Sequence, residues 1–182
     1  TTFTGSNIYE EDIYTDAGVQ ALGRKGTRTS NLLYDLPSKG VTVEFWTRKN
    51  TRFGQSLGRQ HKESLFDLWN GHLSSSSDYG RLTLYASGTS IPHPDTYRGI
   101  FLNAYSGTAG IQELLVLPSA SYDYFSQDWT HLAFAFSSGS SLGLTVKTYV
   151  NGALAHTTGS SIALNEVTGA LRGRIGAFFF FF

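Results

Sequence analysis

The chain has 182 residues, which is enough for one domain with a sizeable hydrophobic core. Its 14 basic and 14 acidic residues cancel, so no nucleic acid or other polyanion is expected as a partner. The absence of Cys excludes disulfides and Cys-based metal sites, and no apolar run approaches the roughly 18 residues of a membrane-spanning helix.

Residues 1–29 are polar and irregular, and we predict an N-terminal arm or a first strand there. Short segments of alternating apolar and polar residues follow, bounded by turn residues, which is the pattern of β-strands. They run in the order NLLYDL, VTVEFWT, SLFDLW, RLTLYA, GIFLNAY, QELLVL and WTHLAFAF. In VTVEFWT, the alternation puts Val43 and Phe45 on one face and Trp46 on the other.

WTHLAFAF alternates most regularly. Its large apolar residues share one face, at Leu132, Phe134 and Phe136. Trp129 and His131 share the other face. Trp46 and Trp129 are large enough that we expect them to anchor the packing between two sheets. His131 is expected to pack on a sheet face with a hydrogen-bonded partner; a ligand or catalytic role is the alternative.

The segment LTVKTYVNGALAHTT has two alternating runs around Asn151-Gly152. This dipeptide favours a type I′ turn, because both central residues of that turn need a positive φ. We therefore predict a β-hairpin over residues 144–158. About ten short strands with frequent turns and no long helical periodicity predict an all-β fold, either an antiparallel sandwich or a barrel.

Four of these segments resemble the concanavalin A-like lectin/glucanase superfamily and, within it, the laminin-G-like jelly-roll domain. VTVEFWTRKN is similar to an early family strand, DWTHLAFAF to a later Trp-containing strand, VKTYVNGALA to the hairpin after it, and GALRGRIGA to the next strand. The four occur in the family's order and cover roughly residues 30–177. The resemblance implies that residues 30–182 form one antiparallel two-sheet jelly-roll sandwich.

Family members usually continue to a last strand inside a sheet, and that strand is missing after GALRGRIGA. The five terminal residues, Phe178–Phe182, would be apolar on both faces of a strand. We expect their outer face to be covered by a missing segment, another domain, or a neighbouring subunit in an oligomer or larger assembly. A second interpretation is that this run is not native sequence.

Hydrolases of the superfamily carry two carboxylates on one strand, in the pattern Glu-x-Asp-x-x-Glu, about 5–5.5 Å apart in retaining enzymes. The nearest match is EEDIYT, in which Glu10 and Asp12 fit but Thr15 occupies the place of the acid/base carboxylate. The sequence also lacks a Gly-x-Ser-x-Gly and a His-Glu-x-x-His motif. We therefore expect that the chain is not an enzyme.

The resemblance also implies that Ca²⁺ could bind at a loop rim, through Asp side chains and backbone carbonyls. The candidates are Asp78, Asp95, Asp123 and Asp128, which all lie in loop-like surroundings. The alternative is that these are solvated loop carboxylates. No other cofactor is expected.

Glycan binding usually needs an exposed aromatic ring that stacks on the C–H face of a sugar, beside polar donors and acceptors. Three loops contain this mixture of residues. The candidate glycan-binding residues are Asn70, His72, Asp78 and Tyr79; His93, Asp95, Tyr97 and Arg98; and Tyr122, Asp123 and Tyr124. The alternative is that these aromatic rings pack onto the sandwich or form a protein interface.

The hypothesis from the sequence is a non-catalytic, lectin-like module that binds glycan at a cell or particle surface as part of a larger surface protein. The alternative is a structural or assembly domain of a virion or phage particle, such as a capsid decoration, fibre or tail, acting through protein contacts. The expected location is extracellular or on a virion surface.

Overall fold

The structure, a computed structural model, describes residues 2–4, 36, 40–49, 60–89, 96–124, 126–139, 143–164 and 171–175. These residues form ten β-strands and one short 3₁₀ helix. The strands are β1 (Thr2–Thr4), β2 (Val41–Thr47), β3 (Gln60–Trp69), β4 (Gly80–Thr89), β5 (Thr96–Ser106), β6 (Ala109–Pro118), β7 (Thr130–Gly139), β8 (Gly143–Val150), β9 (Ala153–Ser160) and β10 (Arg172–Ile175). The short helix, η1 (Ser119–Ser121), follows β6.

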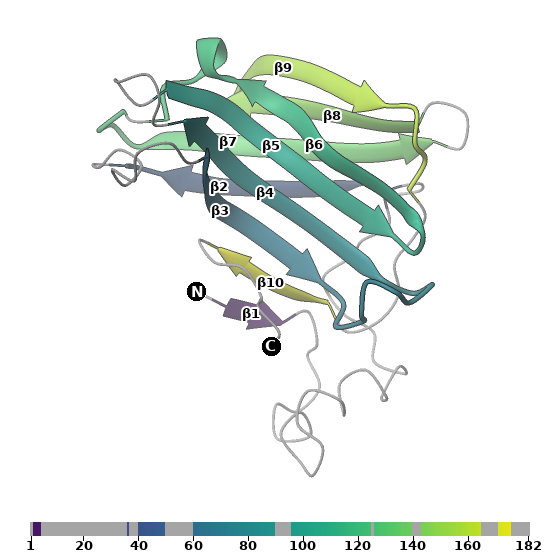
Figure 1. The fold of residues 1–182 in the computed structure, drawn as a ribbon. Helices are drawn as coiled ribbons and strands as arrows, with labels where there is room; N and C mark the ends of the chain where they lie inside the picture. Colours follow the sequence, from purple (N-terminus) through teal and green to yellow (C-terminus); the bar gives the residue numbers. More distant parts are fainter. Residues whose placement is uncertain are drawn as a thin grey trace.

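The strands form two antiparallel sheets that pack face to face (Figure 1). One sheet has six strands in the order β1-β10-β3-β4-β5-β6, and the other has four in the order β2-β7-β8-β9. Every pairing in both sheets is antiparallel. The predicted all-β, two-sheet antiparallel sandwich is therefore confirmed.

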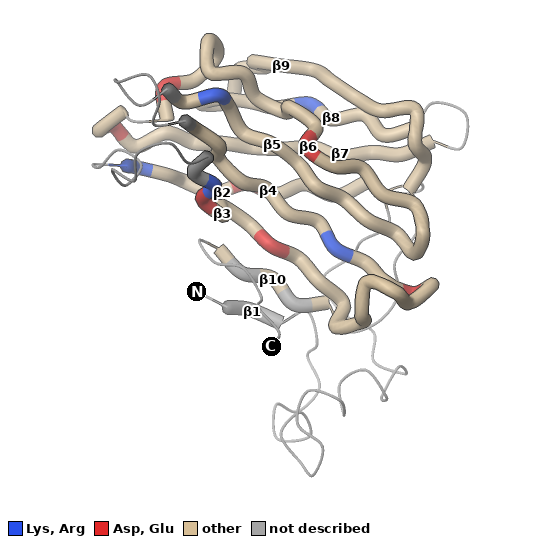
Figure 2. Tube along the Cα trace, in the orientation of Figure 1, with Lys and Arg blue, Asp and Glu red and all other residues tan. Residues whose placement is uncertain are grey.

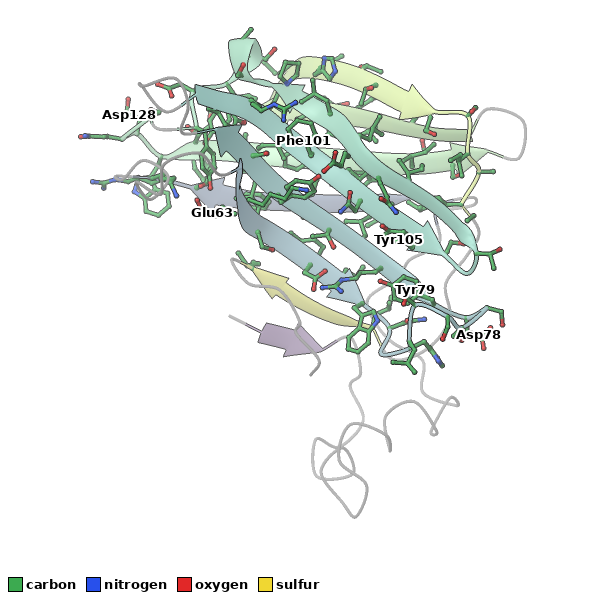
Figure 3. The ribbon with its side chains drawn as sticks, in the orientation of Figure 1. Glu63, Asp78, Tyr79, Phe101, Tyr105 and Asp128 are labelled. Carbon is green, nitrogen blue, oxygen red and sulfur yellow. The ribbon has the colours of Figure 1, made fainter. Side chains whose placement is uncertain are left out.

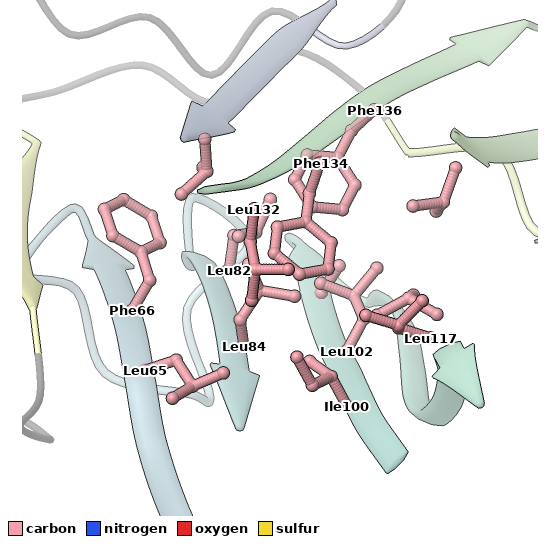
Figure 4. Packing of buried hydrophobic residues seen from close by; sticks show 14 of the residues in the cluster. Leu65, Phe66, Leu82, Leu84, Ile100, Leu102, Leu117, Leu132, Phe134 and Phe136 are labelled. Atoms are coloured by element: carbon pink, nitrogen blue, oxygen red, sulfur yellow. The ribbon is translucent and has the colours of Figure 1, made fainter. Parts of the chain in front are cut away.

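The hydrophobic core lies between the two sheets and follows the predicted alternation (Figure 4). From β7 of the four-stranded sheet, the predicted residues Leu132, Phe134 and Phe136 are buried. The six-stranded sheet contributes alternate residues of its central strands, including Leu82, Leu84, Ile100 and Leu102. Every second residue of β4 and β5 therefore points away from this core.

The predicted hairpin is also present. β8 and β9 pair antiparallel around Asn151 and Gly152, whose φ angles are 50° and 81°. Positive φ at both positions is what a type I′ turn requires, and Asn and Gly are the residues that tolerate it.

The prediction for Trp46 and Trp129 is wrong. These side chains do not anchor the packing between the sheets, because 63% of Trp46 and 60% of Trp129 is exposed. Val43 and Phe134 occupy the inward positions of their strands, so the alternation turns both tryptophans outward.

Some predictions fall largely outside the described residues. Thr2–Thr4 form β1 beside β10, but residues 5–35 are not described, so the boundary at residue 29 stays a prediction. Phe178–Phe182 and the incomplete motif at Glu10, Asp12 and Thr15 also lie outside.

Candidate functional site

The side of β3–β6 that points away from the core, here called the front face, carries three rows of side chains. The rows follow from the register of neighbouring strands. They are Ser64–Tyr85–Phe101, Asp67–Thr83–Asn103 and Trp69–Arg81–Tyr105. A row of hydrogen-bonding residues therefore lies between two rows that contain aromatic rings.

The central row is joined to the row of Arg81 by an ion pair whose carboxylate is buried and whose guanidinium is partly exposed. Asp67 is fully buried, and its two carboxylate oxygens accept hydrogen bonds from Nε and a terminal nitrogen of Arg81, each 2.8 Å long. The hydroxyl of Thr83 donates a third bond, also 2.8 Å, to the same carboxylate. Burial acts to lower the pKa of Arg81, but its hydrogen bond to Asp67 and the charge of Asp67 outweigh it and raise the pKa.

One aromatic row is held by the loop between β3 and β4. The indole Nε1 of Trp69 donates a 2.9 Å hydrogen bond to the carbonyl oxygen of His72. Tyr79, at the end of the loop, lies against Tyr105 of β5 with ring centroids 5.6 Å apart. Figure 3 labels Tyr79 and Tyr105 on this side of the sheet. The loop thus covers Trp69 and leaves Tyr105 half-buried.

The other aromatic row is covered by charged side chains. The rings of Tyr85 and Phe101 stack with their centroids 5.8 Å apart. The ammonium of Lys62 lies 4.9 Å from the centroid of the Tyr85 ring, and the guanidinium of Arg98 lies 5.9 Å from that of Phe101. Cations over aromatic faces are attracted by the negative charge of the ring face.

Lys62 also forms an ion pair across the front face. Its Nζ is 2.7 Å from a carboxylate oxygen of Glu113. Because Lys62 belongs to β3 and Glu113 to β6, this pair reaches over β4 and β5, and it covers Tyr85. The hydrogen bond raises the pKa of Lys62 and lowers that of Glu113. Both shifts favour the charged forms that make the pair.

Glu113 occupies an irregular point of β6. Its φ of 54° is positive, which is rare for a residue with a side chain, and the pairing of β5 with β6 shifts register there. Its backbone N–H donates a 2.8 Å hydrogen bond to the side-chain oxygen of Asn103. The amide oxygen of Asn103 therefore accepts a bond from the protein, and its NH₂ group is the part of the side chain that could donate to a ligand.

Charge is sparse on the front face. Figure 2 shows isolated acidic and basic positions along β3–β6 and no block of one sign. The arrangement therefore offers hydrogen bonds and aromatic surface, and it shows no patch that would attract a highly charged ligand.

The first predicted glycan-binding loop borders this face, but Asn70 supports the loop instead of facing solvent. It is buried, its side-chain NH₂ donates to the carbonyl oxygen of Asp78 at 2.5 Å, and its side-chain oxygen accepts from the N–H groups of His72 and Gly80. Tyr79 is buried as well, whereas His72 is half-buried and Asp78 is exposed.

The structure brings the other predicted tyrosines together, but inside the protein. Tyr97, Tyr122 and Tyr124 are buried, with ring centroids 5.3–6.5 Å apart. Burial raises the pKa of all three phenols, that of Tyr122 to about 12. Their rings therefore do not meet the requirement for an exposed stacking surface. Arg98 and Asp123 are exposed.

The candidates for calcium do not gather. Among the described residues, no group of three or more His, Asp or Glu side chains is arranged to hold a metal ion. Asp78 and Asp128 lie at opposite ends of the molecule in Figure 3, and Asp123 is exposed. His93 and Asp95 lie outside the described residues. Calcium binding stays a prediction.

Sequence reasoning missed the residues that build the front face. The missed residues are Asp67, Arg81, Thr83, Phe101, Asn103 and Tyr105. A signal was present, because in SLFDLW and RLTLYA the alternation puts Asp67 and Thr83 opposite to the core leucines. In the part of the chain that is described, no helix is long and apolar enough to cross a membrane.

No protein-family model and no curated protein matches the sequence. Solved structures do match, and one of them is a β-glucanase of Bacillus licheniformis, 18% identical with a TM-score of 0.39. The match covers 81% of this chain and 57% of the glucanase chain, so this chain spans little more than half the length of that protein. The two-sheet sandwich is a property of the fold, and membership of the concanavalin A-like superfamily stays a prediction. The laminin-G-like subgroup stays a prediction.

The comparison corrects one expectation. From the sequence we expected that the chain is not an enzyme, but the similar structure is that of a β-glucanase, so this exclusion does not stand. A likeness at this level equally supplies no argument that the present chain cleaves glucan. A catalytic role is therefore left open.

Proposed function

We propose that the protein binds carbohydrate and that the front face is the binding site. The observation that supports this most is the outward side of β5, where Phe101, Asn103 and Tyr105 follow one another in the order aromatic–amide–aromatic. All three side chains are partly exposed, whereas the Asp67 and Thr83 side chains beside them are buried. A ligand would therefore meet the β5 residues first.

The chemistry of this stripe matches that of a sugar. A pyranose ring has an apolar C–H face and a rim of hydroxyl groups, each of which can donate and accept a hydrogen bond. Phe101 and Tyr105 offer partly exposed aromatic surface, and Asn103 offers its NH₂ group between them. Successive outward residues of a strand lie about 7 Å apart, which is comparable with the width of one sugar ring.

The polar centre of the face is also held in place before a ligand arrives. The hydrogen bond from the Glu113 N–H orients the amide of Asn103. The Asp67–Arg81 pair orients the Asp67 carboxylate in the same row. Groups that are already ordered lose less conformational entropy when a ligand binds. An extracellular or particle-surface location suits such a role and is part of the proposal. Binding is proposed here without a claim about cleavage.

A glycan array followed by calorimetry on the whole chain tests the proposal. Asn103→Asp keeps the oxygen that accepts from Glu113 but removes the NH₂ donors, so we expect affinity to fall about tenfold for the loss of one good hydrogen bond. Thr42→Ala changes an exposed residue of the other sheet and should leave binding unchanged. Equal affinity of Asn103→Asp and wild type contradicts the proposed site. No glycan binding together with a stable oligomer in light scattering favours an assembly role instead.

A further inference from the structure

The outward side of the four-stranded sheet carries the two most exposed tryptophans among the described residues. Trp46 ends the outward series of β2, and Trp129 directly precedes β7. Exposure alternates along the chain from Trp129 through buried Thr130 to half-buried His131, so Trp129 and His131 lie on the same side. Trp46 pairs with His131 in the register of β2 and β7.

The contacting rings of Trp46 and His131, together with Trp129 two residues before His131 on the same side, are here called the Trp platform. The rings of Trp46 and His131 are in contact, with centroids 5.2 Å apart and planes inclined by 45°. Trp129 lies two residues from His131 on the same strand side and diagonally across the strand pair from Trp46, within reach of a long side chain.

The platform is supported from the β8–β9 hairpin. The backbone N–H of His131 donates a 2.9 Å hydrogen bond to the side-chain oxygen of Asn151, and its carbonyl oxygen accepts a 2.8 Å bond from the backbone N–H of Asn151. On the other side, Nε2 of His131 lies 3.8 Å from a carboxylate oxygen of Glu44. The central ring is thus held by both neighbouring strands, although it is partly exposed.

The two tryptophan rings alone are too small for a protein interface, which would also have to include exposed neighbours such as Leu154. About 60% of each tryptophan is exposed, and a large aromatic side chain has at most roughly 250 Å² to bury, so the two rings offer about 300 Å². A stable protein interface needs roughly 800 Å² on each partner. The next outward residues on β7 are the short Ala133 and Ala135, so the rings project further from the sheet than these neighbours do.

A sugar chain suits this surface better, because two rings presented on a flat sheet match the C–H faces of successive sugars. Hydrogen-bonding groups surround the rings: the exposed Glu44 carboxylate, the exposed Asp128 carboxylate and Arg48. These groups carry two negative charges and one positive charge, so they do not form a patch of one sign that would attract a highly charged ligand. We propose that the Trp platform is a second carbohydrate-binding site, separate from the front face, for a neutral glycan chain of at least two sugar rings.

The test uses the whole chain and soluble neutral hexasaccharides of glucose, mannose and xylose. The three indole N–H signals of Trp46, Trp69 and Trp129 are followed by NMR during titration. We expect the signals of Trp46 and Trp129 to move with at least one hexasaccharide, while the signal of Trp69, which belongs to the front face and is bonded to His72, reports binding at that other site. Trp46→Ala and Trp129→Ala should each weaken this binding about tenfold, the loss of one aromatic contact.

Leu154→Ala is the matched control, because Leu154 is exposed and apolar on the same side of the same sheet and is not part of the platform. It should leave the affinity unchanged. If no hexasaccharide moves either exposed indole signal, the platform is not a glycan site. If both tryptophan variants bind as wild type while Asn103→Asp does not, the front face alone binds sugar and this inference is wrong. If Trp46→Ala and Leu154→Ala both abolish self-association in sedimentation, the surface is a protein interface, which also overturns it.

Discussion

The outward sides of the two sheets both carry large aromatic residues, but these residues are covered on one sheet and exposed on the other. On the front face, only 2% of Tyr85 is exposed although it points away from the core. On the four-stranded sheet, most of Trp46 is bare. The difference lies in the neighbours, because Lys62 and Glu113 reach over Tyr85, whereas Trp46 lies beside its cross-strand partner His131 and still stays mostly exposed. The exposure of an outward ring therefore depends on whether side chains from other strands reach over it.

The largest expected effect tests whether the Asp67–Arg81 ion pair supports the front face. Asp67→Ala removes the buried counter-ion of Arg81, and we expect a cost of about 3 kcal/mol, the lower end of the range for buried pairs, because 23% of the Arg81 side chain is exposed. We expect a loss of this size in the free energy of unfolding measured by urea denaturation.

The double variant Asp67→Leu/Arg81→Met is the control for that change. It removes both charges and keeps apolar volume, so it should be far less destabilised than Asp67→Ala. A double variant as unstable as Asp67→Ala would mean that the loss comes from shape and not from the unpaired charge.

The next effect compares the three tryptophans directly. Trp69 is buried under the β3–β4 loop, so we expect Trp69→Ala to cost about 3 kcal/mol of folding free energy. Trp46→Ala and Trp129→Ala change exposed residues and should stay within about 0.5 kcal/mol of wild type. Thermal and urea unfolding of the three variants measure this. A large loss for Trp46→Ala would show that the platform is part of the folding core and would break the contrast between the two sheets.

Local patterns predicted the parts of the fold that depend on neighbours in the sequence. The hairpin around Asn151-Gly152 was predictable because the turn dictates the backbone of two residues. The core face of β7 was predictable because alternation alone assigns it. The misplacement of Trp46 came from giving residue size more weight than the alternation, which had already placed it opposite to Val43.

The candidate site depended on contacts between residues distant in sequence. Asp67 meets Arg81 only because the β3–β4 loop sets the register of the two strands, and Lys62 meets Glu113 across two further strands. No periodicity within one segment carries that information. The same limit explains Asn70 and Tyr124, whose residue types fit a binding loop while their positions put them inside the protein.

The smallest effect concerns the exposed pair that covers Tyr85. Because the hydrogen bond from Lys62 lowers the pKa of Glu113 from its ordinary value of 4.5, the pair stabilises the folded state above that pH. This contribution is lost as the pH falls through the lowered folded pKa. The difference in Tm between wild type and Glu113→Gln should therefore be small at neutral pH, shrink further in high salt, and vanish in acid. A difference that persists when Glu113 is protonated would mean that its charge is not the cause, because Glu113→Gln leaves the positive φ unchanged. The ion pair would then not explain why Tyr85 is covered while Trp46 is exposed.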